Sequence, residues 1–134
     1  NQVYVGHKYG LKSNLTVSEN LMFDLQNNNV DKRDKLTEAI DIYKMSKYKD
    51  TLVKHLSHGQ QKKVSLMRTL LLDSDIWVLD EPFSALDDET KEILNETFVG
   101  AIRQNKAIII TGHNTFKHDL INVQNCLLED GRIQ

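Results

Sequence analysis

The spacing of apolar residues predicts a helical first half of the chain. A helix is predicted after Thr16, because Thr16 and Glu19 have the spacing of a capping box and an apolar stripe follows them. The segment 27–31 (Asn-Asn-Asn-Val-Asp) interrupts this pattern, and Asp31 can cap a second helix. Residues 46–55 show no clean period. The apolar positions of the two helices, which recur at helical spacing, are Leu21, Met22, Leu25, Leu36, Ile40 and Tyr43.

A third helix is predicted after Ser57, within the sequence Leu-Ser-His-Gly-Gln at 56–60. Ser57 and Gln60 have the spacing of a second capping box. The free N–H groups of the first helical turn, the small Gly59 and the Ser57 hydroxyl can together bind an anion such as phosphate. The plainer interpretation is a well-capped helix without a ligand. The predicted buried positions of this helix are Val64, Met67, Leu70 and Leu71.

The second half of the chain has the pattern of a parallel α/β sheet. Residues 76–80 (Ile-Trp-Val-Leu-Asp) and 107–111 (Ala-Ile-Ile-Ile-Thr) are continuous apolar runs, as expected of strands buried on both faces. A helix that begins in the acidic segment 87–90 lies between them, and a strand–helix–strand order predicts parallel pairing. Residues 2–6 can form another short strand, and 126–133, with its Asp-Gly turn, predicts a terminal hairpin.

Candidate catalytic side chains follow two of these strands. Asp80 and Glu81 lie at the carboxyl end of the run 76–80, where ligands bind in open α/β sheets. Asp80 can hold Mg²⁺ through water, and Glu81 can accept a proton from an attacking water. His113 follows the second run and can hydrogen-bond a phosphate or that water. The plainer interpretations are two acids in a corner that turns at Pro82, and a polar surface histidine.

Composition places limits on these functions. The chain has 134 residues, 40% hydrophobic and 27% charged, which is typical of a globular domain with one core. The net charge of −2 does not favour nucleic acid as a partner. The single cysteine, Cys126, excludes an intrachain disulfide framework. Because no apolar run approaches the ~20 residues of a membrane span, any membrane role is expected to need a partner protein.

The order of the motifs resembles that of the ATP-binding cassette (ABC) ATPases. Leu56 to Gln60 is similar to the signature motif of that family, and Ile76 to Asp80 is similar to its Walker B strand. Glu81 then resembles the catalytic base, Ser84 to Asp87 the D-loop, and His113 the switch histidine. The plainer interpretation of Ser84 and Asp87 is that they cap a helix.

The resemblance implies an α/β fold, that of a P-loop NTPase-like cassette with a mostly parallel sheet. Residues 1–13 and 56–134 are expected to form the core, with a terminal β-hairpin, and 14–55 a helical subdomain. Implied cofactors are ATP and Mg²⁺, and implied partners are a second copy of the cassette and an integral membrane transporter subunit, with no nucleic acid. The implied site residues are Glu81 and His113 for catalysis, Asp80 for the metal, and Ser57, Gly59, Gln60, His7 and Asp87 for the nucleotide.

Three features depart from the general family pattern. His7 occupies the usual position of the Q-loop glutamine, and His58 stands where the signature normally has a small residue. A phosphate-binding G-x-x-x-x-G-K-[ST] motif is absent from the sequence. The chain is therefore expected to be the C-terminal part of a cassette, inactive alone but an ATPase when complete, and a naturally truncated protein is the alternative.

The segment from Gly6 to Val17 resembles one subfamily more closely. A Gly-His pair followed by Gly-x-Lys and Leu-Thr is similar to the ATP-binding subunit of the haem exporter of cytochrome c biogenesis (the CcmA type). This resemblance implies ATP-driven haem export from the cytoplasmic face of the cell membrane, or from the matrix side in a mitochondrion. The alternatives are another ABC transporter, a soluble ABC protein without a transport role, and a cassette that binds a partner without hydrolysis.

Overall fold

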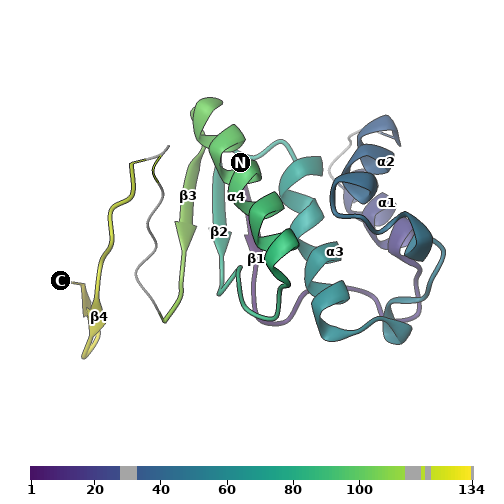
Figure 1. Ribbon diagram of the computed structural model, residues 1–134, viewed down its shortest axis with the longest axis horizontal. Helices are drawn as coiled ribbons and strands as arrows, with labels where there is room; N and C mark the ends of the chain where they lie inside the picture. The colour runs from purple at the N-terminus through teal and green to yellow at the C-terminus, as the bar shows by residue number, and fades with distance from the viewer. Residues whose placement is uncertain (28–32, 114–118, 120–121, 134) are drawn as a thin grey trace.

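A three-stranded parallel sheet lies at the centre of the computed structural model, which describes residues 1–27, 33–113, 119 and 122–133 (Figure 1). The strands are β1 (Gln2–Val5), β2 (Ile76–Leu79) and β3 (Ala107–Ile110), and β2 lies between the other two. Their pairing aligns the last residues of all three strands. The three predicted strands and their parallel pairing are therefore confirmed.

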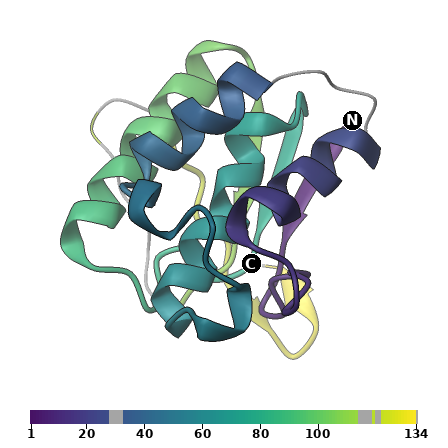
Figure 2. The ribbon, with the colours of Figure 1, turned by 90° about the vertical axis from the view of Figure 1, so that its right-hand side faces the viewer.

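The connection from β1 to β2 contains five helical segments among the described residues. It contains α1 (Val17–Asn27), α2 (Arg33–Ile42), two short 3₁₀ helices at Ser46–Tyr48 and Val53–His55, and α3 (His58–Leu71). The helices α1 and α2 pack against each other and against α3 (Figure 2). Residues 46–55, which show no clean period, thus form short turns rather than a fourth α-helix.

A capping box fixes the start of α1, as predicted. The Thr16 amide donates to Glu19 Oε2 at 2.7 Å, and the Glu19 amide donates to Thr16 Oγ1 at 3.2 Å. Hydrogen bonds from the amide and, to a smaller extent, the hydroxyl of Thr16 lower the pKa of the Glu19 carboxyl, because they favour its charged form. The predicted cap at Asp31 lies outside the described residues.

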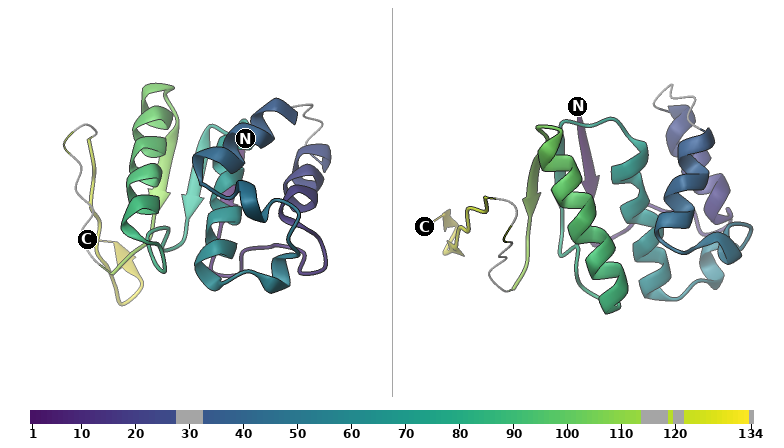
Figure 3. Two further views of the ribbon diagram at one scale, coloured as in Figure 1. Left: turned by 45° about the vertical axis from the view of Figure 1, so that its right-hand side comes forward. Right: turned by 45° about the horizontal axis from the view of Figure 1, so that its top comes forward.

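The connection from β2 to β3 is the single helix α4 (Asp88–Arg103), which packs along β3 (Figure 3). At the other end of the chain, β4 (Leu128–Glu129) and β5 (Arg132–Ile133) form an antiparallel hairpin. Both residues of its Asp130–Gly131 turn have positive φ angles, as two-residue hairpin turns require. The predicted terminal hairpin is confirmed.

One expectation about the sheet is wrong, because the strands are not buried on both faces. Val3, Trp77 and Leu79 point into the core, beneath α3 and α4. On the opposite face, the side chains of Tyr4 and Ile109 are 62% and 57% exposed. Within the described residues, helices cover only one face, so half of each apolar run remains open to solvent.

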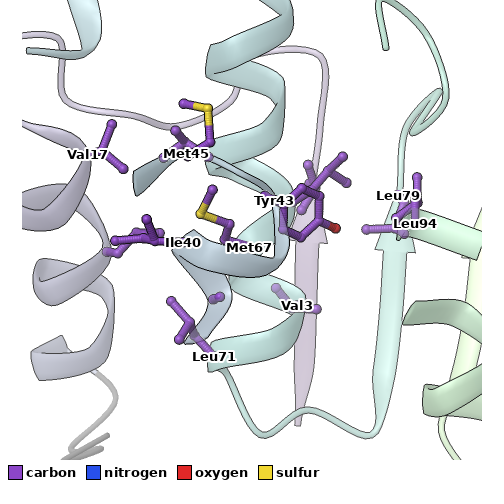
Figure 4. Close-up of a cluster of buried hydrophobic side chains, with 14 of the residues drawn as sticks. Val3, Val17, Ile40, Tyr43, Met45, Met67, Leu71, Leu79 and Leu94 are labelled. Carbon is purple, nitrogen blue, oxygen red and sulfur yellow. The ribbon is translucent and has the colours of Figure 1, made fainter. Parts of the chain in front are cut away.

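The core is a single apolar cluster that joins the helices to the sheet (Figure 4). Side chains from α1, α2, α3, α4 and two strands meet in it without a boundary between the first and second halves of the chain. No helix of the described residues is long and apolar enough to cross a membrane. Members drawn in Figure 4 include Val3, Val17, Ile40, Tyr43, Met45, Met67, Leu71, Leu79 and Leu94.

Candidate functional site

The candidate site lies at the carboxyl edge of the parallel sheet. His7 follows β1, Asp80 and Glu81 follow β2, and His113 follows β3. Two backbone hydrogen bonds continue the strand pairing to this edge, since Asp80 N donates to the Val5 carbonyl at 2.8 Å and Thr111 N to the Leu79 carbonyl at 3.0 Å. The parallel topology therefore gathers candidate residues that are more than one hundred positions apart in the sequence.

Glu81 and His113 are in direct contact. His113 Nε2 lies 2.8 Å from Glu81 Oε1, and both side chains are accessible to solvent at this edge. An acid and an imidazole in hydrogen-bonding contact can share a proton and can together orient a water molecule. The structure thus brings together the two residues that the sequence indicated for catalysis.

Thr111 links the two acids to β3. Its hydroxyl donates to Asp80 Oδ1 at 2.5 Å and accepts from the Glu81 amide at 3.1 Å. One hydroxyl can do both, because it carries one donor and two acceptor sites. Sequence reasoning missed this residue, although a hydroxyl side chain directly after an apolar strand was a signal that could have found it.

The backbone at Glu81 has an unusual conformation. Its φ angle is +46°, in the left-handed region that residues other than glycine rarely occupy. The Glu81 carbonyl accepts three hydrogen bonds, from Ser84 N at 3.1 Å, Ser84 Oγ at 2.9 Å and Lys62 Nζ at 3.0 Å. These donors fix the orientation of the Glu81 peptide group. They therefore also fix the direction in which the Glu81 side chain leaves the backbone.

Lys62 of α3 is buried behind Asp80 and Glu81, which we call the acid pair. Its ammonium donates to the carbonyls of Asp80 and Glu81 at 3.3 and 3.0 Å and lies 5.5 Å from the centre of the Tyr9 ring. Burial lowers the pKa of Lys62, whereas the negative charges of Asp80 and Glu81 oppose this shift. The next residue, Lys63, contacts Asp87 at 3.0 Å. Neither lysine was a candidate from the sequence.

The predicted capping box begins α3. Gln60 N donates to Ser57 Oγ at 3.2 Å, and Ser57 N donates to Gln60 Oε1 at 2.8 Å. The Ser57 hydroxyl can still donate its own proton, and the first turn directs free N–H groups outward. Gln60, in contrast, uses its side-chain oxygen within the helix.

Gly59 allows α3 to approach the loop that follows the acids. A Cβ atom at this position would lie 2.8 Å from the carbonyl oxygen of Ala85, which is closer than real Cβ atoms come to backbone atoms. Ala85 belongs to the predicted D-loop, so two predicted nucleotide-binding segments pack directly against each other. This close packing explains the presence of a glycine at position 59 without any ligand.

Asp87 is the N-cap of α4. Its Oδ1 accepts from the amide and the hydroxyl of Thr90, at 2.8 and 2.7 Å, and its Oδ2 contacts Lys63. These interactions, of which the Thr90 hydroxyl is the largest, hold the pKa of Asp87 well below its usual range. The capping interpretation is therefore confirmed for Asp87 but not for Ser84, whose hydroxyl donates to the Glu81 carbonyl in the preceding turn. The predicted contact of Asp87 with the nucleotide stays a prediction.

The segment after His7 is tied to α3 at two points. The Tyr9 hydroxyl and His58 Nε2 are 2.7 Å apart, so His58 packs beside Tyr9, with the ring centres 5.2 Å apart. Arg68 donates to the carbonyls of Tyr9 and Gly10 at 2.7 and 3.1 Å. A positive φ of 63° at Gly10 permits this turn. His7 itself is exposed beside these anchored residues.

The donor set fits a magnesium ion shared with a nucleotide. The described residues contain no group of three or more His, Cys, Asp or Glu side chains that could hold a metal. Mg²⁺ is usually bound by one or two carboxylates together with phosphate and water. Asp80 could supply one such carboxylate, and Thr111 holds its side chain through one oxygen.

Known proteins match much of this chain. The family model described as "ABC transporter" matches residues 1–84. The cytochrome c biogenesis ATP-binding export protein CcmA of Shewanella oneidensis is 38% identical over 112 residues, which are 83% of this chain and 51% of that protein. The CcmA protein of Pasteurella multocida is 32% identical over 133 residues, which are 98% and 59% of the two chains. The chain spans about half the length of the curated relatives it matches.

Solved structures share the fold. An ATP-binding subunit of an ABC transporter has a TM-score of 0.76 at 20% identity, over 84% of this chain and 48% of that one. An ATP-binding cassette, solved as a dimer in a post-hydrolysis state with ADP and Pi, has a TM-score of 0.71 at 22% identity, over 85% and 53%. At this level of identity, the likeness concerns the fold alone.

Proposed function

Because this chain belongs to the ABC transporter family, we propose that it is the part of an ATP-hydrolysing subunit that carries the acid pair and the signature motif. The observation that supports this proposal most directly is the contact of 2.8 Å between Glu81 and His113, next to Asp80 on the carboxyl edge of the sheet. In this proposal, a proton acceptor, the residue that orients it and a metal ligand all belong to one edge of the sheet.

Each residue of the edge has a proposed role in hydrolysis. Glu81 accepts the proton of the attacking water, and His113 orients the Glu81 carboxylate and the phosphate. Asp80 holds Mg²⁺, which neutralises phosphate charge when it is bound. His7, which follows β1 at the same edge, is proposed to contact the nucleotide. The Walker A segment that would hold the phosphates belongs, in this proposal, to the remainder of a complete cassette.

The first turn of α3 is proposed to bind the nucleotide of a second copy of the cassette. The Ser57 hydroxyl and the free N–H groups beside Gly59 are suitable phosphate donors. Gln60 supports them through the capping box, and Asp87 through its ion pair with Lys63. A solved cassette with the same fold is a dimer, and this proposal requires two copies.

The finer proposal is that the complete protein drives export in cytochrome c biogenesis. It rests on the names of relatives that are 32–38% identical, and on the Gly6–His7 segment that resembles the haem-exporter subunits. In this role the protein would work with an integral membrane subunit, at the cytoplasmic face of the membrane. The conformational change that ATP binding causes would then be transmitted to the membrane subunit through α1 and α2.

The first test is Glu81→Gln in the complete cassette. The amide keeps the shape of the side chain but cannot accept a proton from water, so steady-state hydrolysis is expected to fall by at least about a hundredfold. Nucleotide binding, measured with a fluorescent ATP analogue, is expected to stay within about twofold. Glu96→Gln, the same change on an exposed position of α4, is the matched control. Hydrolysis near the wild-type rate in Glu81→Gln would remove Glu81 from its role.

The second test concerns the exported cargo. Cells whose only copy of the gene carries Glu81→Gln are expected to lose holo-cytochrome c, measured by haem staining, and to regain it with the wild-type gene. Normal cytochrome c in a strain with a verified inactive ATPase would reject the biogenesis role, and it would leave the ATPase assignment intact.

A further inference from the structure

Lys62 carries a charge in the interior of the protein. Its side chain is only 2% exposed, and lysine is rarely buried to this degree unless it is paired. Within the described residues its hydrogen-bond partners are the backbone carbonyls of Asp80 and Glu81, not a carboxylate. The buried Lys62 side chain is thus fixed against two successive carbonyls, those of Asp80 and Glu81.

The three donors to the Glu81 carbonyl come from different parts of the fold. Ser84 supplies two of them but belongs to the same turn, so it moves together with Glu81. Lys62 supplies the third from α3, a separate element anchored in the core. The contact with Lys62 is therefore the one that fixes the turn relative to the helix that carries the predicted signature motif.

The backbone at Glu81 needs such a tie. A left-handed φ in a residue other than glycine costs about 1–2 kcal/mol, so the segment tends to relax unless its surroundings hold it. Relaxation would rotate the peptide and swing the carboxylate away from His113. Thr111 holds the amide side of Glu81 from β3, and Lys62 holds the carbonyl side from α3.

We propose that Lys62 is a positioning residue, which fixes the peptide of Glu81 against α3 and thereby keeps the Glu81 carboxylate in contact with His113. This inference rests on the proposed function of Glu81 as the proton acceptor. Lys62 itself does not touch the nucleotide. Its effect is expected in the rate of hydrolysis and not in the affinity for ATP.

The test compares Lys62→Met with Lys62→Arg in the complete cassette. Met keeps the length and packing of the side chain but removes the donor, and kcat is expected to fall about tenfold or more, equivalent to ~1.4 kcal/mol. The KM for ATP is expected to change by less than about twofold. Arg retains the charge and several donors, so Lys62→Arg is expected to keep kcat within about threefold of wild type.

The matched control is Lys106→Met. Lys106 is also largely buried and donates to a backbone carbonyl, that of Ser74 at 2.9 Å, but it lies at the opposite end of the sheet. Its loss is expected to lower the melting temperature and to leave kcat unchanged. If Lys62→Met does not fold, Lys62→Gln replaces it. The shorter amide cannot reach both carbonyls, and the same decrease of about tenfold is expected.

The outcomes separate the two proposals. If the wild-type cassette hydrolyses ATP and Glu81→Gln does not, but the folded Lys62 variant keeps a wild-type kcat, the positioning role is overturned alone. An equal loss of kcat in Lys106→Met would also overturn it, because the effect would then be one of stability. If Glu81→Gln is as active as wild type, the proposed function of Glu81 fails and the role of Lys62 fails with it.

Discussion

Two glycines in helices provide a sharp test of how α3 meets the predicted D-loop. Gly59 lies in the first turn of α3, where an added Cβ would be 2.8 Å from the Ala85 carbonyl oxygen. Gly100 lies in α4, where an added Cβ would have no heavy atom within 4 Å. The same substitution, Gly→Ala, therefore meets a backbone atom at one site and open space at the other.

The expected effects have opposite signs. In Gly100→Ala, the higher helix propensity of alanine is expected to raise the free energy of unfolding by roughly 0.5–1 kcal/mol. In Gly59→Ala, the methyl group must displace the Ala85 carbonyl, and overpacking of this kind costs about 1–3 kcal/mol. This cost exceeds the gain in propensity, so the two variants should differ by about 1–3 kcal/mol.

Thermal unfolding of the complete protein measures the difference. For a domain of about 150–250 residues, 1 kcal/mol shifts the melting temperature by roughly 2–4 °C, so the variants should melt about 2–12 °C apart. Gly100→Ala serves as the internal standard for the benefit of alanine in a helix. Equal stabilisation in Gly59→Ala would refute the close approach of α3 to Ala85.

Two further predictions concern the contacts that hold α3 in place. Arg68→Met is expected to lower the free energy of unfolding, measured in urea, by about 2–4 kcal/mol, because the ion pair of 2.7 Å between Arg68 and the largely buried Asp24 is lost, and adding Asp24→Asn should recover part of this cost. Full wild-type stability in Arg68→Met would contradict this. Asp87→Asn keeps an acceptor for Thr90 but loses the ion pair with Lys63. Because the folded state lowers the pKa of Asp87, its charge stabilises the fold above the ordinary carboxyl pKa of about 4 and less so as the pH falls further. The difference in melting temperature between wild type and Asp87→Asn should thus be present at pH 7 and smaller at pH 3. A difference that does not change with pH would show that the Asp87 charge does not stabilise the fold.

The helix starts could be predicted because each capping box is a local feature. Thr16 and Glu19, like Ser57 and Gln60, are three residues apart, so the sequence contains both partners of each hydrogen-bond pair. The meeting of Asp80, Glu81 and the histidine after β3 was predictable for a different reason. The carboxyl ends of parallel strands lie on one edge, so the order of the strands is enough to place these side chains together.

The exposure of the sheet could not be predicted from the apolar runs. Ile76 and Ile109 are as hydrophobic as their neighbours in the strands, yet 40% and 57% of their surfaces are exposed. An apolar run indicates that both faces suit burial, but it does not indicate which described element covers each face. The run therefore predicted the strands correctly and their surroundings incorrectly.

The contacts of Lys62 with two carbonyls, and that of Thr111 with the Glu81 amide, were missed because the partners are backbone groups. Every residue has a carbonyl and, apart from proline, an amide, so no partner residue type in the sequence points to such a contact. The separation adds to the difficulty, since Lys62 and the Glu81 carbonyl are 19 positions apart in different elements. Only the tertiary packing of α3, which contacts β1, brings Lys62 to the turn that follows β2.

The position of Lys62 still carried a signal, because α3 is buried on two sides. The sequence predicted one apolar stripe on α3, but α3 packs between the helices α1 and α2 and the strand β1. The predicted stripe consists of Val64, Met67, Leu70 and Leu71. A helix in this position needs a second buried stripe. Ser65 and Leu66, three and four residues after Lys62, are fully buried and belong to it. A lysine in line with a second buried stripe cannot extend freely into solvent, so it must find acceptors inside, and in this protein they are the carbonyls of the acid pair.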